Sequence, residues 1–207
     1  MIIKKTKKTF KRWKQYSNIS GVGDITRRYF VMNAFDGALT MLGVVIGAYI
    51  AGALNSITII SAGIAGSIAM GASGMSGAYM AEKAERKKKI KDLERAMLTD
   101  MSNGLHEKSH KFAATFAAIV DGASPAMAAM FVITPFFLAN IGLIDPEFAF
   151  FGTIGLTLLV LTLLGIYLAK ISEENMILYG IQMLFVGLIT AGLCIATSVL
   201  LGGNVPV

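Results

Sequence analysis

Cysteine, proline and charged residues are all scarce in this chain of 207 residues. It contains one cysteine and four prolines, and charged residues make up only 15% of it. The single Cys194 cannot form an intrachain disulfide, and a cysteine cluster for a metal is excluded. Hydrophobic residues make up 55% of the chain, and the mean hydropathy is +0.64. Because soluble domains carry about 25% charged residues, this composition favours a protein that resides in a lipid bilayer.

Charges are nearly absent from five long apolar stretches. A helix needs roughly 20 apolar residues to cross a bilayer, and each stretch reaches that length. The sequence therefore predicts an all-α membrane protein with five transmembrane helices, at about 30–53, 57–81, 112–140, 148–169 and 177–202.

The charged residues divide the chain into three predicted parts. Residues 1–28 form a basic cytoplasmic arm, and residues 29–207 form the five-span transmembrane domain. Within that domain, residues 82–111 form a cytoplasmic segment that is rich in strong helix formers, so we expect it to continue the second span as a helix. Asn103-Gly104 is typical of a helix stop.

Lysine and arginine are absent from the loops at 53–57 and 140–147 and from the tail at 202–207. All 19 of these residues lie before the first span, between Lys83 and Lys111, or at Lys170. The positive-inside rule then places the N-terminus in the cytoplasm and the C-terminus outside the cell membrane. The basic arm is better explained by attraction to the anionic lipid bilayer than by binding to nucleic acid, for which the chain has no motif.

Of the 13 acidic residues, only Asp36 and Asp121 lie inside apolar spans. A charge there costs about 2.5–3.5 kcal/mol on insertion scales, so such residues usually mark an ion or proton path. Each precedes a glycine, in a faint repeat of five residues. That glycine allows either close approach of another helix or a local break that exposes a carbonyl, and Pro125 could break the helix too. The alternative is that both aspartates are protonated and hydrogen-bond to the backbone or to Asn33 and Thr40.

Methionine is frequent near these aspartates. Its thioether is a soft ligand for transition metals, although methionine is also ordinary apolar filler in a span. The predicted ion path therefore comprises Asp36, Asp121 and the neighbouring Asn33, Thr40, Met41, Met75 and Met127.

His106, Glu107 and His110 match the H-E-x-x-H zinc pattern. Asp121 follows His106 by 15 residues on the continuation of the same predicted helix, roughly 20 Å up its axis, so it cannot complete a zinc protease site. A membrane zinc hydrolase that uses these residues is thus the less favoured alternative. A weak cytoplasmic metal site remains, with Glu82 and Glu85 as further candidate ligands.

The segment at 27–47, which contains Asp36-Gly37, Thr40 and Gly43-Val44-Val45-Ile46-Gly47, resembles the first span of the vacuolar iron transporter family. The resemblance implies a homodimer that exchanges iron(II) or manganese for protons, with Asp36 in the ion path and methionines of the second span contributing. The second span departs from the family's Gly-Glu-Tyr, because Ala78 occupies the position of the glutamate, and Asp121 is the candidate substitute.

These observations together predict a proton-coupled exporter of divalent transition metals and no enzyme. Asp36 and Asp121 would be its metal ligands, and the transported iron(II) or manganese would be its cargo, with no permanently bound cofactor. The alternative from another class is a membrane scaffold protein that does not transport.

Overall fold

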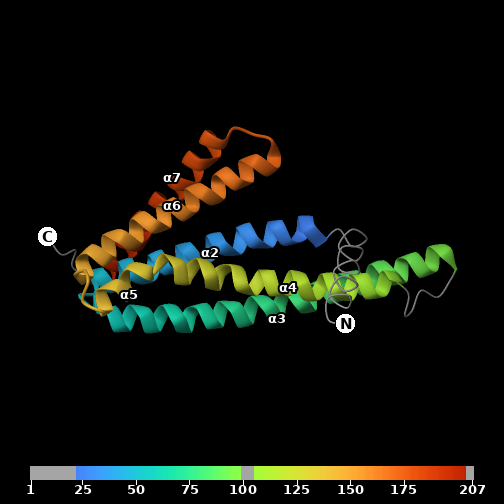
Figure 1. Cartoon of the computed structure of the whole chain (residues 1–207), viewed down its shortest axis with the longest axis horizontal. Helices are drawn as coiled ribbons and strands as arrows, with labels where there is room; N and C mark the ends of the chain where they lie inside the picture. The colour runs from blue at the N-terminus through green and yellow to red at the C-terminus, as the bar shows by residue number, and fades with distance from the viewer. Residues whose placement is uncertain (1–21, 99–104, 204–207) are drawn as a thin grey trace, which may run out of the picture. The chain divides into compact units, whose positions relative to one another are not determined.

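The computed structural model describes residues 22–98 and 105–203, and these residues form six helices and no strand (Figure 1). Five of the helices are long and apolar enough to cross a membrane, and α5 is a short helix between two of them. The prediction of an all-α membrane protein with five transmembrane helices is therefore confirmed. The six helices are α2 (Val22–Ile50), α3 (Ser56–Met97), α4 (Leu105–Val132), α5 (Thr134–Asn140), α6 (Pro146–Ser172) and α7 (Met176–Leu200).

The chain divides into two compact units. Unit 1 consists of Met1–Phe30 and Ala72–Ala123, and unit 2 of Val31–Gly71 and Ser124–Val207. Unit 1 thus holds the start of α2, the second half of α3 and the first half of α4.

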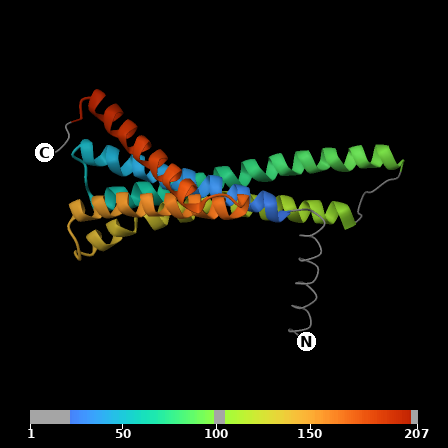
Figure 2. The same cartoon turned by 90° about the horizontal axis from the view of Figure 1, so that it is seen from above.

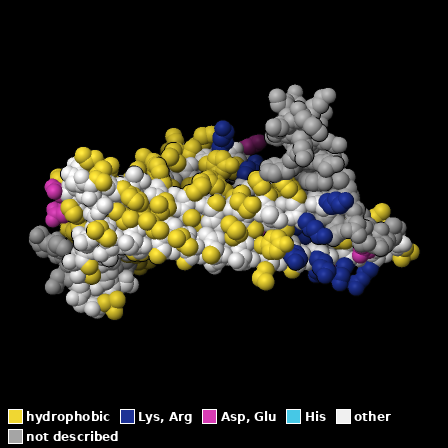
Figure 3. Space-filling view, turned by 60° about the horizontal axis from the view of Figure 1, so that its bottom comes forward, with side chains coloured by type: hydrophobic (Ala, Val, Ile, Leu, Met, Phe, Trp, Pro, Cys, Tyr) yellow, Lys and Arg dark blue, Asp and Glu magenta, His cyan; other side chains and the backbone are white. Residues whose placement is uncertain are grey.

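The helix α3 has 42 residues and is continuous from the second predicted span into the charged segment, as Figure 2 shows in green. At 1.5 Å per residue it is about 60 Å long, twice the thickness of the hydrocarbon core, so its charged half must lie outside the bilayer. In unit 1, lysine and arginine gather over this half of α3 (Figure 3). The predicted helical extension of the second span is therefore confirmed, while the predicted stop at Asn103-Gly104 lies outside the described residues.

Unit 2 has an apolar core to which α2, α3, α4, α5 and α6 all contribute. Small residues of α2 and α4 let the helices approach, and larger side chains fill the space between them. One cluster of this core contains Ala34, Ala38, Met41, Ala128, Ala129, Val132, Ile133, Leu161 and Leu164. A second cluster joins Leu42, Val45 and Ile46 to Ile59, Phe136, Ala149 and Phe150.

The helices α6 and α7 pack against each other within unit 2 (Figure 1). A Cβ at Gly165 would lie 2.6 Å from the carbonyl oxygen of Tyr179, so only glycine allows this approach. Asn175 caps the N-terminus of α7, and its side-chain oxygen accepts hydrogen bonds from the backbone N–H groups of Ile177 and Leu178.

The third span is not the single helix that the apolar stretch at 112–140 predicts. Helix α4 ends at Val132 and α5 begins at Thr134. Pro135 has no N–H to donate to the carbonyl of Phe131, and the hydroxyl of Thr134 donates to that carbonyl instead, at 2.6 Å. The proline therefore accounts for the interruption.

Candidate ion-translocation site

Asp36 lies in α2, which is helical without interruption through Asp36-Gly37. Its side chain is exposed, and so is that of Thr40 one turn later, whereas Asn33 is half-buried. These three polar residues lie three and four positions apart, which puts them on one face of the helix. The opposite face, which includes Ala34 and Ala38, is buried in the core of unit 2.

Gly37 brings α2 into backbone contact with α4. A Cβ at Gly37 would lie 2.2 Å from the carbonyl oxygen of Pro125 and 2.7 Å from its Cα, both in unit 2. No side chain fits in this space. The glycine of the first Asp-Gly pair is therefore required by the packing of two helices.

Asp121 lies in α4 and is half-buried in unit 1. Its carboxylate faces α3 at Gly74, because a Cβ at Gly74 would lie 2.9 Å from Oδ2 of Asp121 and 3.2 Å from the Cα of Gly122. The two helices thus meet at glycines on both sides, and the carboxylate lies beside the contact. The close approach expected from Asp121-Gly122 is confirmed.

The local helix break expected as the other role of these glycines is wrong. Both α2 and α4 continue through their Asp-Gly pairs, and Pro125 lies inside α4. Pro125 has no N–H to donate to the carbonyl of the residue four positions earlier, so α4 continues through it with one helical hydrogen bond fewer. The third span is interrupted only further on, at Ile133, between α4 and α5.

The three candidate methionines lie in different surroundings. Met41 is 1% exposed and belongs to the core of unit 2, where its Cε would lie 3.2 Å from a Cβ at Gly63. Met75 and Met127 are 43% and 61% exposed. Met75 directly follows Gly74 in unit 1, so it is the candidate methionine next in sequence to the glycine that faces Asp121.

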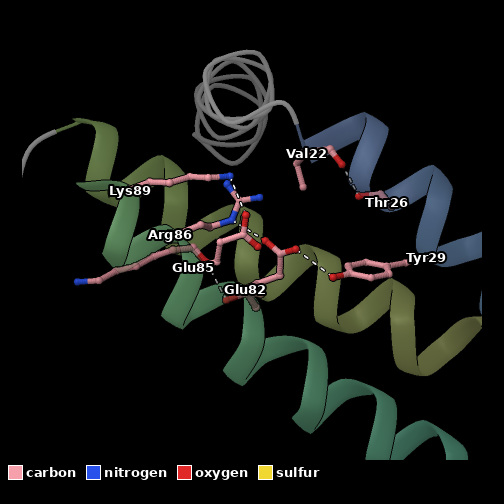
Figure 4. A network of polar contacts seen from close by, with 9 residues as sticks. Val22, Thr26, Tyr29, Glu82, Glu85, Arg86 and Lys89 are labelled. Carbon is pink, nitrogen blue, oxygen red and sulfur yellow. Dashed lines mark hydrogen bonds and ion pairs between the residues drawn. The ribbon is translucent and has the colours of Figure 1, made fainter. Parts of the chain in front are cut away.

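Glu82 is held in a buried cluster of charged and polar groups in unit 1 (Figure 4). Its Oε2 accepts a hydrogen bond from Nε of Arg86 at 2.9 Å, and its Oε1 accepts one from the hydroxyl of Tyr29 at 3.0 Å. The side chains of Glu82 and Arg86 are each 6% exposed. The Tyr29 bond links α2 to α3 across 53 positions of sequence.

Glu85 differs from Glu82 although it lies only three residues later. It is 61% exposed and forms an ion pair with Lys89 at 2.9 Å. The hydrogen bond from Lys89, and then its positive charge, hold the pKa of the Glu85 carboxyl below its usual value. This carboxylate is solvated and paired at the surface.

The H-E-x-x-H residues begin α4, and their side chains lie outside the described residues. Because α4 runs from Leu105 to Val132, His106 and Asp121 lie on one helix, as expected. Among the side chains that the structure describes, which leave out His106, Glu107 and His110, no group of three or more histidine, cysteine or acidic residues could hold a metal ion.

Sequence reasoning did not single out Tyr29 and Arg86. The spacing of Glu82 and Arg86, four residues apart on a helix, was a visible signal for their ion pair. The burial of that pair and its contact with Tyr29 depend on the packing of α2 and α3.

Comparisons with known proteins agree with this architecture. The sequence pattern of the VIT family matches residues 87–199, more than half of the chain and a region that includes Asp121. An uncharacterized protein of Methanocaldococcus jannaschii is 37% identical over 177 residues, which cover 83% of this chain and 88% of that protein. No solved structure matches the chain.

The chain therefore belongs to the VIT family, the vacuolar iron transporter family that its first span resembles. Membership of this family, together with the five long apolar helices, defines the class of the protein. It is a multi-pass membrane protein of a metal-ion transporter family.

Proposed function

We propose that the protein exports iron(II) or manganese from the cytoplasm across the cell membrane in exchange for protons, with Asp36 and Asp121 as the residues that bind the cargo. The observation that carries this proposal is the position of Asp121. Its carboxylate is half-buried where α3 and α4 meet at Gly74 and Gly122. A carboxylate in a span usually marks an ion path.

Proton coupling follows from the chemistry of the carboxylates. A carboxyl group must lose its proton before it can bind a divalent cation, so protons and metal compete for the same oxygens. An aspartate that binds the cation at cytoplasmic pH would release it when protons arrive from the other side. The orientation that this mechanism requires is the one predicted from the distribution of lysine and arginine.

A homodimer is supported by the position of Asp36. Asp36 and Thr40 lie on an exposed face of α2. A carboxylate exposed to lipid at this depth would cost about 2.5–3.5 kcal/mol on insertion scales. A second copy of the chain that covers this face would keep the carboxylate away from lipid and would place the two Asp36 residues at the subunit interface.

Metal uptake by proteoliposomes tests the proposal. Purified protein would be reconstituted, and uptake of iron(II), manganese, cobalt and zinc would be followed with and without a pH gradient. We expect gradient-dependent uptake of iron(II) or manganese, which Asp36→Asn and Asp121→Asn abolish. Glu147→Gln, which neutralises an exposed acid in the first turn of α6, is the control and should transport normally. Absence of uptake of any metal by folded wild-type protein would favour the scaffold alternative.

A further inference from the structure

Glu82 and Arg86 form a buried ion pair in unit 1. Burial of two charges is costly, and a buried pair is often no more stabilising than apolar residues of the same size. The chain contains a comparison, because Glu85 and Lys89 have the same spacing and the same 2.9 Å separation but are each 61% exposed. Stability alone therefore does not explain why the first pair is buried.

The pair lies on the ridge of α3 that leads to Asp121. Gly74, Ala78, Glu82 and Arg86 follow one another at intervals of four residues, and each is buried or half-buried in the described structure. Gly74 is the residue that faces the Asp121 carboxylate. Glu82 lies eight residues further along α3, about 12 Å along the helix axis, and only the methyl group of Ala78 occupies the ridge between them.

The carboxylate of Glu82 accepts a hydrogen bond on each of its two oxygens. Arg86 binds one oxygen through Nε, and the hydroxyl of Tyr29 donates to the other (Figure 4). Two donors from two different helices fix the orientation of the group, and one of them carries a positive charge. An arriving divalent cation would compete with that positive charge for the same oxygen.

We infer that Glu82 and Arg86 form a displaceable ion pair in the half of α3 that we place in the cytoplasm. At rest the guanidinium of Arg86 neutralises the Glu82 carboxylate. An arriving divalent cation takes the place of the guanidinium on that carboxylate. The cation then moves along the α3 ridge to Asp121. Tyr29 is a positioning residue that holds the carboxylate while its partner changes. This inference rests on the proposed transport function.

The test is manganese(II) binding to the full-length protein in detergent at pH 8, measured from the electron paramagnetic resonance signal of free manganese(II). Arg86→Gln keeps an amide that can donate to Glu82 and removes the competing charge, so we expect at least tenfold tighter binding. Glu82→Gln should weaken binding, and the double variant should show none of the gain. Lys89→Gln, which removes the same type of partner from the exposed pair, should change affinity less than twofold.

A second variant keeps the inference testable if Arg86→Gln does not fold. Tyr29→Phe removes only the hydroxyl that donates to Glu82 and leaves the ion pair in place. We expect several-fold weaker manganese(II) binding and a small fall in melting temperature, because the buried carboxylate loses one of its two donors. Unchanged affinity in both Arg86→Gln and Tyr29→Phe, or loss of affinity in Arg86→Gln as large as in Glu82→Gln, would overturn the displaceable pair.

The outcome also separates this inference from the transport proposal. If the wild-type protein transports manganese while Arg86→Gln binds it no more tightly, the ion pair has only a structural role and the proposed function stands. If neither the wild-type protein nor Arg86→Gln binds or transports manganese or iron(II), both proposals fail.

Discussion

Replacing Gly37 with alanine is expected to force α2 and α4 apart. The new methyl group would lie 2.2 Å from the carbonyl oxygen of Pro125, and 2.7 and 2.8 Å from its Cα and carbonyl carbon. Ordinary contacts of a Cβ begin near 3.4 Å, so the backbones must separate by about 1 Å. Backbone atoms cannot rotate away as a side chain would, and overpacking of this kind typically costs about 1–3 kcal/mol.

Gly47 provides a matched control for this substitution on the same helix. A Cβ at Gly47 meets no atom within 4 Å. Alanine is favoured over glycine in a helix by about 1 kcal/mol at both positions. If overpacking costs about 3 kcal/mol at Gly37 and nothing at Gly47, the Gly37→Ala variant is less stable than the Gly47→Ala variant by about 3 kcal/mol. For a chain of this size, that difference in stability lowers the melting temperature by roughly 6–12 °C.

The measurement is thermal unfolding of both variants in the same detergent, followed by circular dichroism at 222 nm. We expect Gly47→Ala to melt at or slightly above the wild-type temperature and Gly37→Ala to melt well below it. Equal melting temperatures for the two variants would refute the reasoning that α2 and α4 meet backbone to backbone at Gly37.

Two further predictions concern the α6–α7 contact and the exposed ion pair. Gly165→Ala should lower the melting temperature, because the new Cβ would lie 2.6 Å from the carbonyl oxygen of Tyr179. Gly155→Ala is the control and should not lower it, because a Cβ at Gly155 meets nothing within 4 Å. Similar melting temperatures for the two variants would contradict the close contact between α6 and α7. The pKa of the Glu85 carboxyl is lowered in the folded state, so its ion pair with Lys89 stabilises the fold at pH values above the pKa of this carboxyl in the unfolded state. This stabilisation is lost as the pH falls through the pKa of Glu85 in the folded state. Because the pair is solvated, Lys89→Gln should leave the melting temperature between pH 4 and pH 7 nearly unchanged, and a large acid-dependent difference would show that the pair is less exposed than described.

The helices could be predicted from sequence because a run of about 20 apolar residues has few alternatives to a membrane span. The helical extension of α3 can also be predicted from the sequence, since strong helix formers continue past Ala81 without a break. The interruption at Ile133 cannot be predicted from hydropathy, because the apolar stretch continues through it and hydropathy does not depend on the missing N–H of Pro135.

The candidate site could be predicted only in part. An aspartate in an apolar span is visible in the sequence, and Asp36 and Asp121 were found in this way. That Gly74 faces Asp121, and that Tyr29 donates to Glu82, depends on which helices pack together. The first of these contacts joins residues 47 positions apart and the second joins residues 53 positions apart, so no local sequence pattern predicts them.

The central claim is that Asp36 and Asp121 carry the metal and the proton in turn. The most direct test measures metal uptake and proton release simultaneously in proteoliposomes, for the wild-type protein and for Asp121→Asn. The account predicts that wild-type vesicles exchange protons for iron(II) or manganese in a fixed ratio and that Asp121→Asn loses both fluxes together while it remains folded. Metal uptake by Asp121→Asn with the wild-type rate and the same proton ratio would contradict the account.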